Sequence, residues 1–139
     1  MATTPETDRD FDALLATGKP VLLKARGNSM YPMIPDGTQV LVAPLAPTAR
    51  LKIGQVVFAR TGQSYLLHRV LKVAGDKVLL KGDWNRAQDG WFARDLLIGW
   101  AVCLWRNGER FPLEGCVARR AGLVVSAMIP PLGRLLRLI

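Results

Sequence analysis

Short apolar stretches, many of them alternating with polar residues, dominate the middle of the chain. They are rich in valine, leucine and aromatic residues and are bounded by glycine, proline and aspartate, which is typical of strands. The predicted strands lie at 21–25, 38–43, 55–60, 65–73, 78–81, 96–105 and 110–113. The last two are joined by Asn107-Gly108, a strong hairpin signal. Many short strands at regular spacing predict a mostly β fold, a small barrel-like domain.

The two ends of the chain have a helical pattern instead. Phe11, Leu14 and Leu15 share one face of a short predicted helix over 10–17. Residues 117–139 contain four arginines and no acid among many apolar residues, and this predicts a helical, basic and amphipathic tail. We expect Pro130-Pro131 to break that helix. Between two strands, residues 83–94 carry no clear period and are expected to be irregular.

These patterns divide the chain into three segments. Residues 1–9 are polar and are expected to be disordered, 10–116 form one domain, and 117–139 form the tail. The tail has two open interpretations. It lies on an anionic membrane as a peripheral helix, or it packs on the β-domain or on a partner.

Net charge adds little to this picture. The chain carries +8, but its basic residues are scattered and no helix-turn-helix or zinc pattern is visible, so we do not expect nucleic acid as a partner. Cys103 and Cys116 lack metal-ligand spacing. The acidic start is the reverse of an export signal, and no stretch is apolar enough to span a bilayer. We therefore expect a cytoplasmic location, with membrane association left open.

The candidate catalytic residues are a serine on a predicted loop and the single histidine of the chain. Ser29 lies in Gly27-Asn28-Ser29-Met30-Tyr31-Pro32, between a flexible glycine and a turn-forming proline, which suits a nucleophile displayed on a tight loop. The single histidine, His68, lies in a largely apolar strand. A serine needs a base to remove its proton, and imidazole is the usual one. A buried structural histidine is the alternative for this residue.

A histidine base also needs an acceptor that orients its second ring nitrogen. Asp83 and Asp89 are the candidates, since both lie in the irregular segment after the strand at 78–81. Each has an alternative as a turn residue. The sequence therefore leaves open which acid orients His68.

Four ordered pieces carry a family resemblance. They are Ser29-Met30-x-Pro32, Gly54-Gln55-Val56-Val57-Phe58, His68-Arg69-Val70 and Lys81-Gly82-Asp83-x-Asn85. In order and spacing they resemble the signal peptidase I and repressor-autopeptidase superfamily, the S24 and S26 peptidases. With histidine at the base position, the chain is most similar to the Ser-His-Asp branch of the endoplasmic-reticulum and archaeal type.

The resemblance implies a serine endopeptidase domain over 10–116 that needs no metal or other cofactor. It implies cleavage after small residues in an extended protein or leader-peptide substrate. Ser29 is then the nucleophile and His68 the base. Asp89, six residues after Asp83, orients the imidazole, and Asp83 is a second, supporting acid. Gly27 stands where many relatives have a serine that binds the oxyanion, so backbone N–H groups, including that of Ser29, are expected to bind it.

Two other functions fit the same sequence. One is a non-catalytic module that binds a peptide or partner with this fold, in which Ser29 and His68 lie too far apart to interact. The other is a cytoplasmic regulator that cleaves itself or one dedicated partner, in line with the missing membrane anchor.

Overall fold

The computed structural model describes residues 4–5, 10–62 and 64–137 of the protein. The helices are α1 (Phe11–Ala16), the 3-10 turn η1 (Arg94–Leu96) and α2 (Cys116–Arg137). The strands are β1 (Thr4–Pro5), β2 (Val21–Arg26), β3 (Gln39–Pro44), β4 (Val56–Thr61), β5 (Ser64–Ala74), β6 (Lys77–Lys81), β7 (Gly90–Ala93), β8 (Leu97–Arg106) and β9 (Glu109–Pro112). The predicted mostly β fold with a short N-terminal helix and a helical tail is confirmed.

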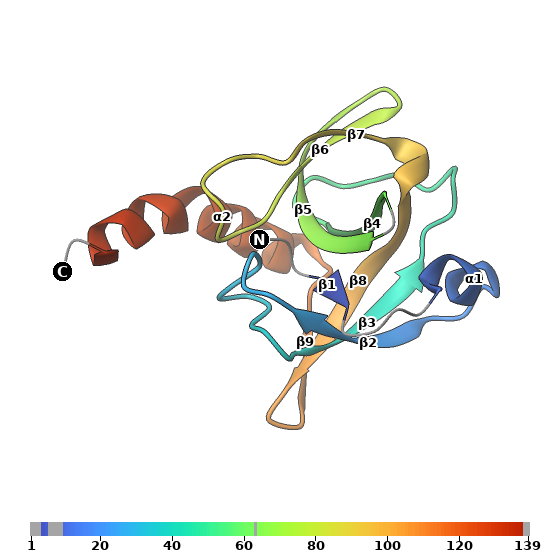
Figure 1. Ribbon diagram of the computed structural model, residues 1–139, viewed down its shortest axis with the longest axis horizontal. Coiled ribbons are helices and arrows are strands. Elements are labelled where there is room, and N and C mark those ends of the chain that lie inside the picture. The colour runs from blue at the N-terminus through green and yellow to red at the C-terminus, as the bar shows by residue number, and fades with distance from the viewer. Residues whose placement is uncertain (1–3, 6–9, 63, 138–139) are drawn as a thin grey trace.

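All strands belong to one antiparallel sheet in the order β1-β2-β3-β8-β4-β5-β6-β7, with β9 paired to β8. The long strand β8 joins the first three strands to the four that carry residues 56–93 (Figure 1). The expected closure into a barrel is wrong, because no pairing joins β1 to β7 among the described residues. These two edge strands are short, with two and four residues.

Apolar side chains form two clusters in this curved sheet. Phe11, Phe58 and Leu67 belong to one cluster, whereas Leu66 and Val70 belong to the other. Alternate residues of β5 thus serve both clusters, and every residue from 66 to 70 is buried. The polar side chains within this run are consequently cut off from water and need partners inside the protein.

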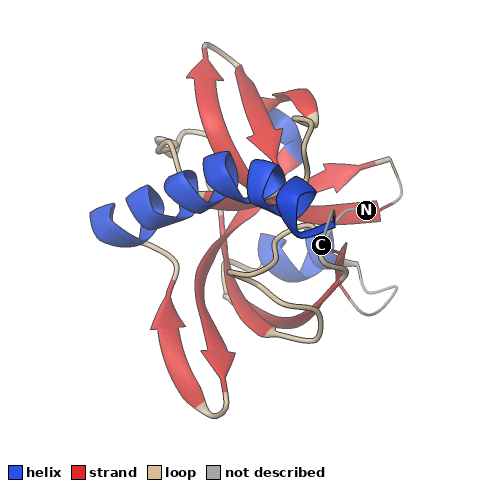
Figure 2. Ribbon diagram, turned by 90° about the vertical axis from the view of Figure 1, so that its left-hand side faces the viewer, coloured by secondary structure: helices blue, strands red, loops and turns tan. Residues whose placement is uncertain are grey.

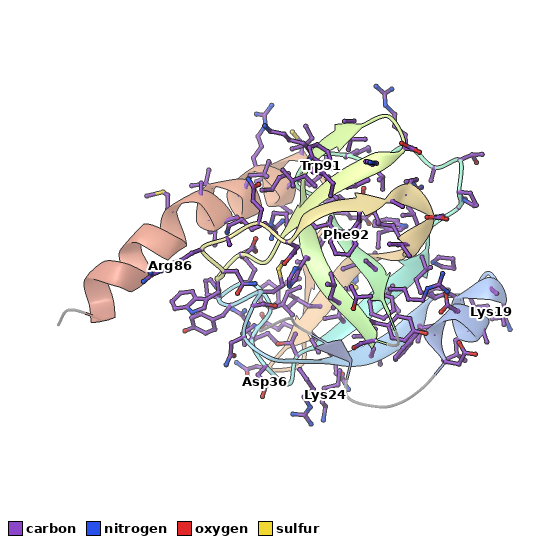
Figure 3. All side chains as sticks on the ribbon, turned by 45° about the horizontal axis from the view of Figure 1, so that its top comes forward. Lys19, Lys24, Asp36, Arg86, Trp91 and Phe92 are labelled. Carbon is purple, nitrogen blue, oxygen red and sulfur yellow. The ribbon has the colours of Figure 1, made fainter. Side chains whose placement is uncertain are left out.

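The structure differs from the predicted elements in two further places. Residues 83–94 are not wholly irregular, because β7 pairs with β6. In β7, Phe92 packs against the second cluster while Trp91 is half exposed (Figure 3). Near the start, Thr4–Pro5 pair with Ala25–Arg26, which corrects the expected disorder there. The rest of that prediction, residues 1–3 and 6–9, lies outside the described residues.

Helix α2 crosses in front of the strands in Figure 2, and in Figure 1 its C-terminal end extends away from them. It is one helix, so the expected break at Pro130-Pro131 is wrong. Proline has no N–H to bond the carbonyl four residues earlier, which is that of Ser126. The Lys81 ammonium donates to this carbonyl instead, at 2.9 Å. Within the described residues, no helix combines the length and the apolar character that a membrane crossing needs.

Candidate active site

The loop after β2 holds Ser29. It starts at Gly27, whose φ of 93° is in the left-handed region that favours glycine. The Gly27 N–H donates to the Asp36 carboxylate at 2.8 Å, and the Tyr31 N–H donates to the Asn28 carbonyl at 3.1 Å. These local bonds set the loop, and they explain why a glycine, a turn residue and an aspartate surround the serine in the sequence. The Ser29 side chain ends up buried, with 1% exposed.

His68 lies on β5 opposite Val57 of β4. Its Nε2 is 2.9 Å from the Ser29 Oγ, a normal hydrogen-bond distance. Only 1% of the histidine is exposed. Its Nδ1 contacts the carboxylate of Asp89. A carboxylate accepts hydrogen bonds, so Nδ1 carries the proton and Nε2 has a free lone pair for the serine hydroxyl.

Asp89 lies in the loop between β6 and β7. Its N–H donates to the Leu80 carbonyl at 2.8 Å, which folds the loop back onto the end of β6. The Asp89 side chain is 20% exposed. Three segments far apart in the sequence thus bring Ser29, His68 and Asp89 into one hydrogen-bonded chain. Such a chain can remove a proton from an alcohol and hold the imidazolium that results.

Asp83, the other acid that the sequence offers for His68, bonds Arg69 instead. Its two oxygens accept from the Arg69 Nε and Nη2 at 2.8 and 2.7 Å, and the Arg69 Nη1 donates to the Gly54 carbonyl at 2.7 Å. Arg69 is 1% exposed and Asp83 is fully buried. A buried carboxylate needs such a partner. Sequence reasoning missed this pair, although an arginine inside an apolar strand is itself a signal that an acid lies nearby.

The loop that carries Asp83 also hydrogen-bonds the serine and lies close to the histidine. The Trp84 N–H donates to the Ser29 carbonyl at 2.8 Å. A Cβ on Gly82 would lie 2.8 Å from that same oxygen and 3.1 Å from the His68 Nε2. Glycine is therefore required here by close approach. Met30, next to the serine, is fully buried and belongs to the first core cluster, which favours a packing role for its side chain.

Tyr31 and Trp84 form an aromatic edge beside this loop. Their rings meet edge to face with centroids 5.2 Å apart, and Tyr31 is 44% exposed. Large apolar surface beside a candidate nucleophile suits contact with a substrate side chain. Among the described residues, no group of histidine, cysteine, aspartate and glutamate side chains is arranged to hold a metal ion.

Lys81, at the end of β6, is a buried cation near the same site. Its ammonium donates to the Gly82 carbonyl at 3.0 Å and to the carbonyl and hydroxyl of Ser126 at 2.9 and 3.1 Å. Burial lowers the pKa of this ammonium, and the nearby carboxylates of Asp83 and Asp89 partly offset that effect. The buried ammonium is thus stabilised by hydrogen bonds to uncharged acceptors of the loop and of α2.

Comparison with known families agrees with this geometry at the level of the fold. The family model described as Peptidase S24-like matches residues 4–94, well over half of the chain. The match includes Ser29, His68, Asp83 and Asp89 and ends before β8 and α2. No curated protein matches the chain. The chain belongs to the Peptidase S24-like family.

Proposed function

We propose that this protein is a serine endopeptidase in which Ser29 is the nucleophile, His68 the general base and Asp89 the residue that orients the imidazole. One observation carries the proposal. The Ser29 Oγ lies 2.9 Å from the His68 Nε2, while the other ring nitrogen contacts Asp89. The family membership supports a peptidase-like domain, and the three side chains supply the parts that acyl transfer needs.

The reaction divides into two halves. As the Ser29 Oγ bonds to the scissile carbonyl carbon, its proton moves to the His68 Nε2, and Asp89 stabilises the imidazolium. The C–N bond then breaks, and the same proton passes to the leaving amine. Water hydrolyses the acyl-serine with His68 again as base. The Gly27 N–H is bonded to Asp36, so we assign oxyanion binding to other backbone N–H groups, that of Ser29 among them.

We propose an extended protein or peptide as the substrate, cut after a small residue. The Tyr31–Trp84 edge is suited to an apolar side chain of that substrate, since it is the exposed aromatic surface next to the Ser29 loop. An extended substrate gains main-chain hydrogen bonds when it adds to a strand edge. A cytoplasmic location stays a prediction.

Cleavage of a pool of extended peptides, followed by mass spectrometry, tests the proposal. We expect wild type and Ser64→Ala to cleave the same peptides, because Ser64 is exposed at the start of β5. Ser29→Ala and His68→Ala should each lose about 10³-fold or more in rate. A Ser29→Ala protein that cleaves like wild type refutes the assignment.

A non-catalytic binding module is the first rival. It requires Ser29 and His68 to be too far apart to interact, and the 2.9 Å hydrogen bond argues against it.

A regulator that cleaves itself or one dedicated partner is the second rival, and the burial of the site favours it. Ser29 and His68 are each 1% exposed. In addition, β1 of the same chain occupies the edge of β2 just before the serine loop and lies against β5. If this rival holds, the peptide pool stays uncut, while a cognate protein, or a chain that lacks residues 1–5, is active on the same Ser29.

For residues 117–139 we propose peripheral contact with an anionic membrane. Val117, Val124 and Met128 are exposed on α2, and this segment contains arginines but no acid. Co-flotation with phosphatidylglycerol vesicles, and its absence with phosphatidylcholine vesicles, is the expected result. Equal behaviour with both lipids contradicts it.

A further inference from the structure

Two buried residues of helix α2 lie against the Peptidase S24-like core next to the candidate site. Gly122 and Ser126 are four residues apart and so share one face of the helix. Both are buried. Gly122 lies over Arg69, and Ser126 lies over Lys81. Residues 69 and 81 pair across β5 and β6, so the helix rests on two neighbouring cations.

The contact at Gly122 is set by shape. A Cβ at this position would lie 2.1 Å from the Arg69 Nη1, a separation that no side chain tolerates without displacing the guanidinium. Arg69 cannot move easily, because all three of its guanidinium nitrogens donate hydrogen bonds to Asp83 or to the Gly54 carbonyl. The backbone of α2 therefore packs directly on the buried ion pair.

The contact at Ser126 is set by hydrogen bonding. The residue that would donate to its carbonyl within the helix is Pro130, which has no N–H. This carbonyl therefore needs a different hydrogen-bond donor. The Lys81 ammonium donates to this oxygen at 2.9 Å and to the Ser126 hydroxyl at 3.1 Å. A serine and a proline four residues apart thus create an acceptor that fits a buried lysine.

The same ammonium also holds the loop that touches the catalytic pair. It donates to the Gly82 carbonyl at 3.0 Å. A Cβ on Gly82 would lie 3.1 Å from the His68 Nε2, and the Trp84 N–H donates to the Ser29 carbonyl at 2.8 Å. Lys81 therefore connects α2, through one nitrogen atom, to the loop that hydrogen-bonds Ser29 and lies close to His68.

We propose that Lys81 is a positioning residue of the active site, which uses Ser126 of α2 as its anchor and keeps the Gly82–Trp84 loop seated against Ser29 and His68. The activity part of this inference rests on the proposed peptidase function. Lys81 touches neither the nucleophile nor the base in this role. Without the hydrogen bonds between Lys81 and Ser126, the Gly82–Trp84 loop is no longer anchored to α2. The distance between the serine and the imidazole is then no longer fixed.

Lys81→Met tests the inference, with Lys77→Met as the matched control. Lys77 lies on the same strand β6 and is exposed. The first measurement is hydrogen exchange at the Trp84 amide, which reports the loop without reference to activity. We expect exchange there to speed up about tenfold or more in Lys81→Met, while amides in the β3–β8 ladder stay as in wild type. Lys77→Met should change neither.

The second measurement is steady-state peptide cleavage. We expect kcat of Lys81→Met to fall about 10- to 100-fold with KM within about threefold, because a misplacement of about 1 Å has that effect on a reacting pair. The inference is overturned if the Trp84 amide exchanges at the wild-type rate in Lys81→Met. It is also overturned if the kcat of that variant is unchanged. If the wild-type protein cleaves no peptide and the Trp84 amide still exchanges faster in Lys81→Met, the proposed function fails and the structural coupling stands.

Ser126→Ala and Ser126→Thr keep the test decisive if Lys81→Met does not fold. Both keep the carbonyl, but only threonine keeps the hydroxyl that accepts from Lys81. We expect Ser126→Ala to lower kcat about 3- to 10-fold, as loss of one hydrogen bond to a charged group allows, and Ser126→Thr to restore it. Equal rates for the two variants overturn the role of Ser126 as anchor.

Discussion

Replacing Arg69 with methionine should destabilise this protein far more than the same change at Arg60. Arg69 and Asp83 form a two-point ion pair at 2.8 and 2.7 Å, with 1% and 0% of the residues exposed. Methionine fills a similar space but leaves the Asp83 carboxylate buried without its partner. It also removes the donor to the Gly54 carbonyl.

The expected loss is about 3–5 kcal/mol, the usual effect of removing one partner from a buried ion pair. A domain of this kind has about 5–15 kcal/mol of stability, so the variant loses about a fifth of it or more. At about 2 kcal/mol per molar urea, the unfolding midpoint should fall by about 1.5–2.5 M. Arg60 pairs with Asp12 at 3.1 Å, but their side chains are 43% and 33% exposed. Its loss should amount to about 1 kcal/mol or less.

Urea unfolding followed by tryptophan fluorescence and by circular dichroism measures both variants. Adding Asp83→Leu to Arg69→Met removes both charges, and this double variant should recover at least half of the lost stability, because no unpaired ion remains. The reasoning is refuted if Arg69→Met and Arg60→Met shift the midpoint equally. It is also refuted if the double variant is less stable than Arg69→Met alone.

Three further predictions concern the site and its surroundings. Asp89→Asn should lower kcat about 10³- to 10⁴-fold, because the imidazole loses its orienting acceptor, while the urea midpoint stays near wild type; retained kcat would exclude Asp89 from that role. Gly82→Ala should lower kcat about 10²-fold or more, since the added Cβ meets the Ser29 carbonyl at 2.8 Å and the His68 Nε2 at 3.1 Å; normal kinetics in this variant would contradict the close approach. Burial lowers the pKa of Lys81 below its ordinary 10.5, so just below pH 10.5 the unfolded chain binds more protons and the stability of wild type relative to Lys81→Met should rise with pH. A flat or falling difference in urea midpoints over that range would argue against a buried ammonium.

Local signals predicted much of this fold. Alternation and turn residues located most strands, because these depend on neighbours along the chain. The Asp10 side chain accepts from the Ala13 N–H at the start of α1, within the segment 10–17 where the sequence predicts a helix. By contrast, β7 has only four residues and forms by pairing with β6. The open sheet depends likewise on which strands meet, and that is a long-range property.

The assignment of the two acids shows the same limit. Sequence alone left Asp83 and Asp89 open for His68, because both follow one strand within a short loop. Register decides between them in the structure. Arg69 pairs with Lys81 across β5 and β6, so the loop that starts there brings Asp83 to the guanidinium. The bond from the Asp89 N–H to the Leu80 carbonyl then returns Asp89 to the strand end beside His68.

The helix α2 marks another such limit. A proline pair normally ends a helix, yet α2 continues, and a lysine 45 positions before Ser126 donates to the carbonyl that Pro130 leaves without its helical donor. No pattern within the tail contains that information.

The most direct test of the central claim is a search for the acyl-enzyme on Ser29. Wild-type protein is mixed with extended peptides that vary around a central alanine, quenched in acid within the first turnover, and its intact mass and digested fragments are measured. We predict an adduct with the mass of the N-terminal half of the cleaved peptide, located on Ser29 and missing in His68→Ala. Peptide cleavage that proceeds with no Ser29 adduct, and at the same rate in Ser29→Ala, would contradict it.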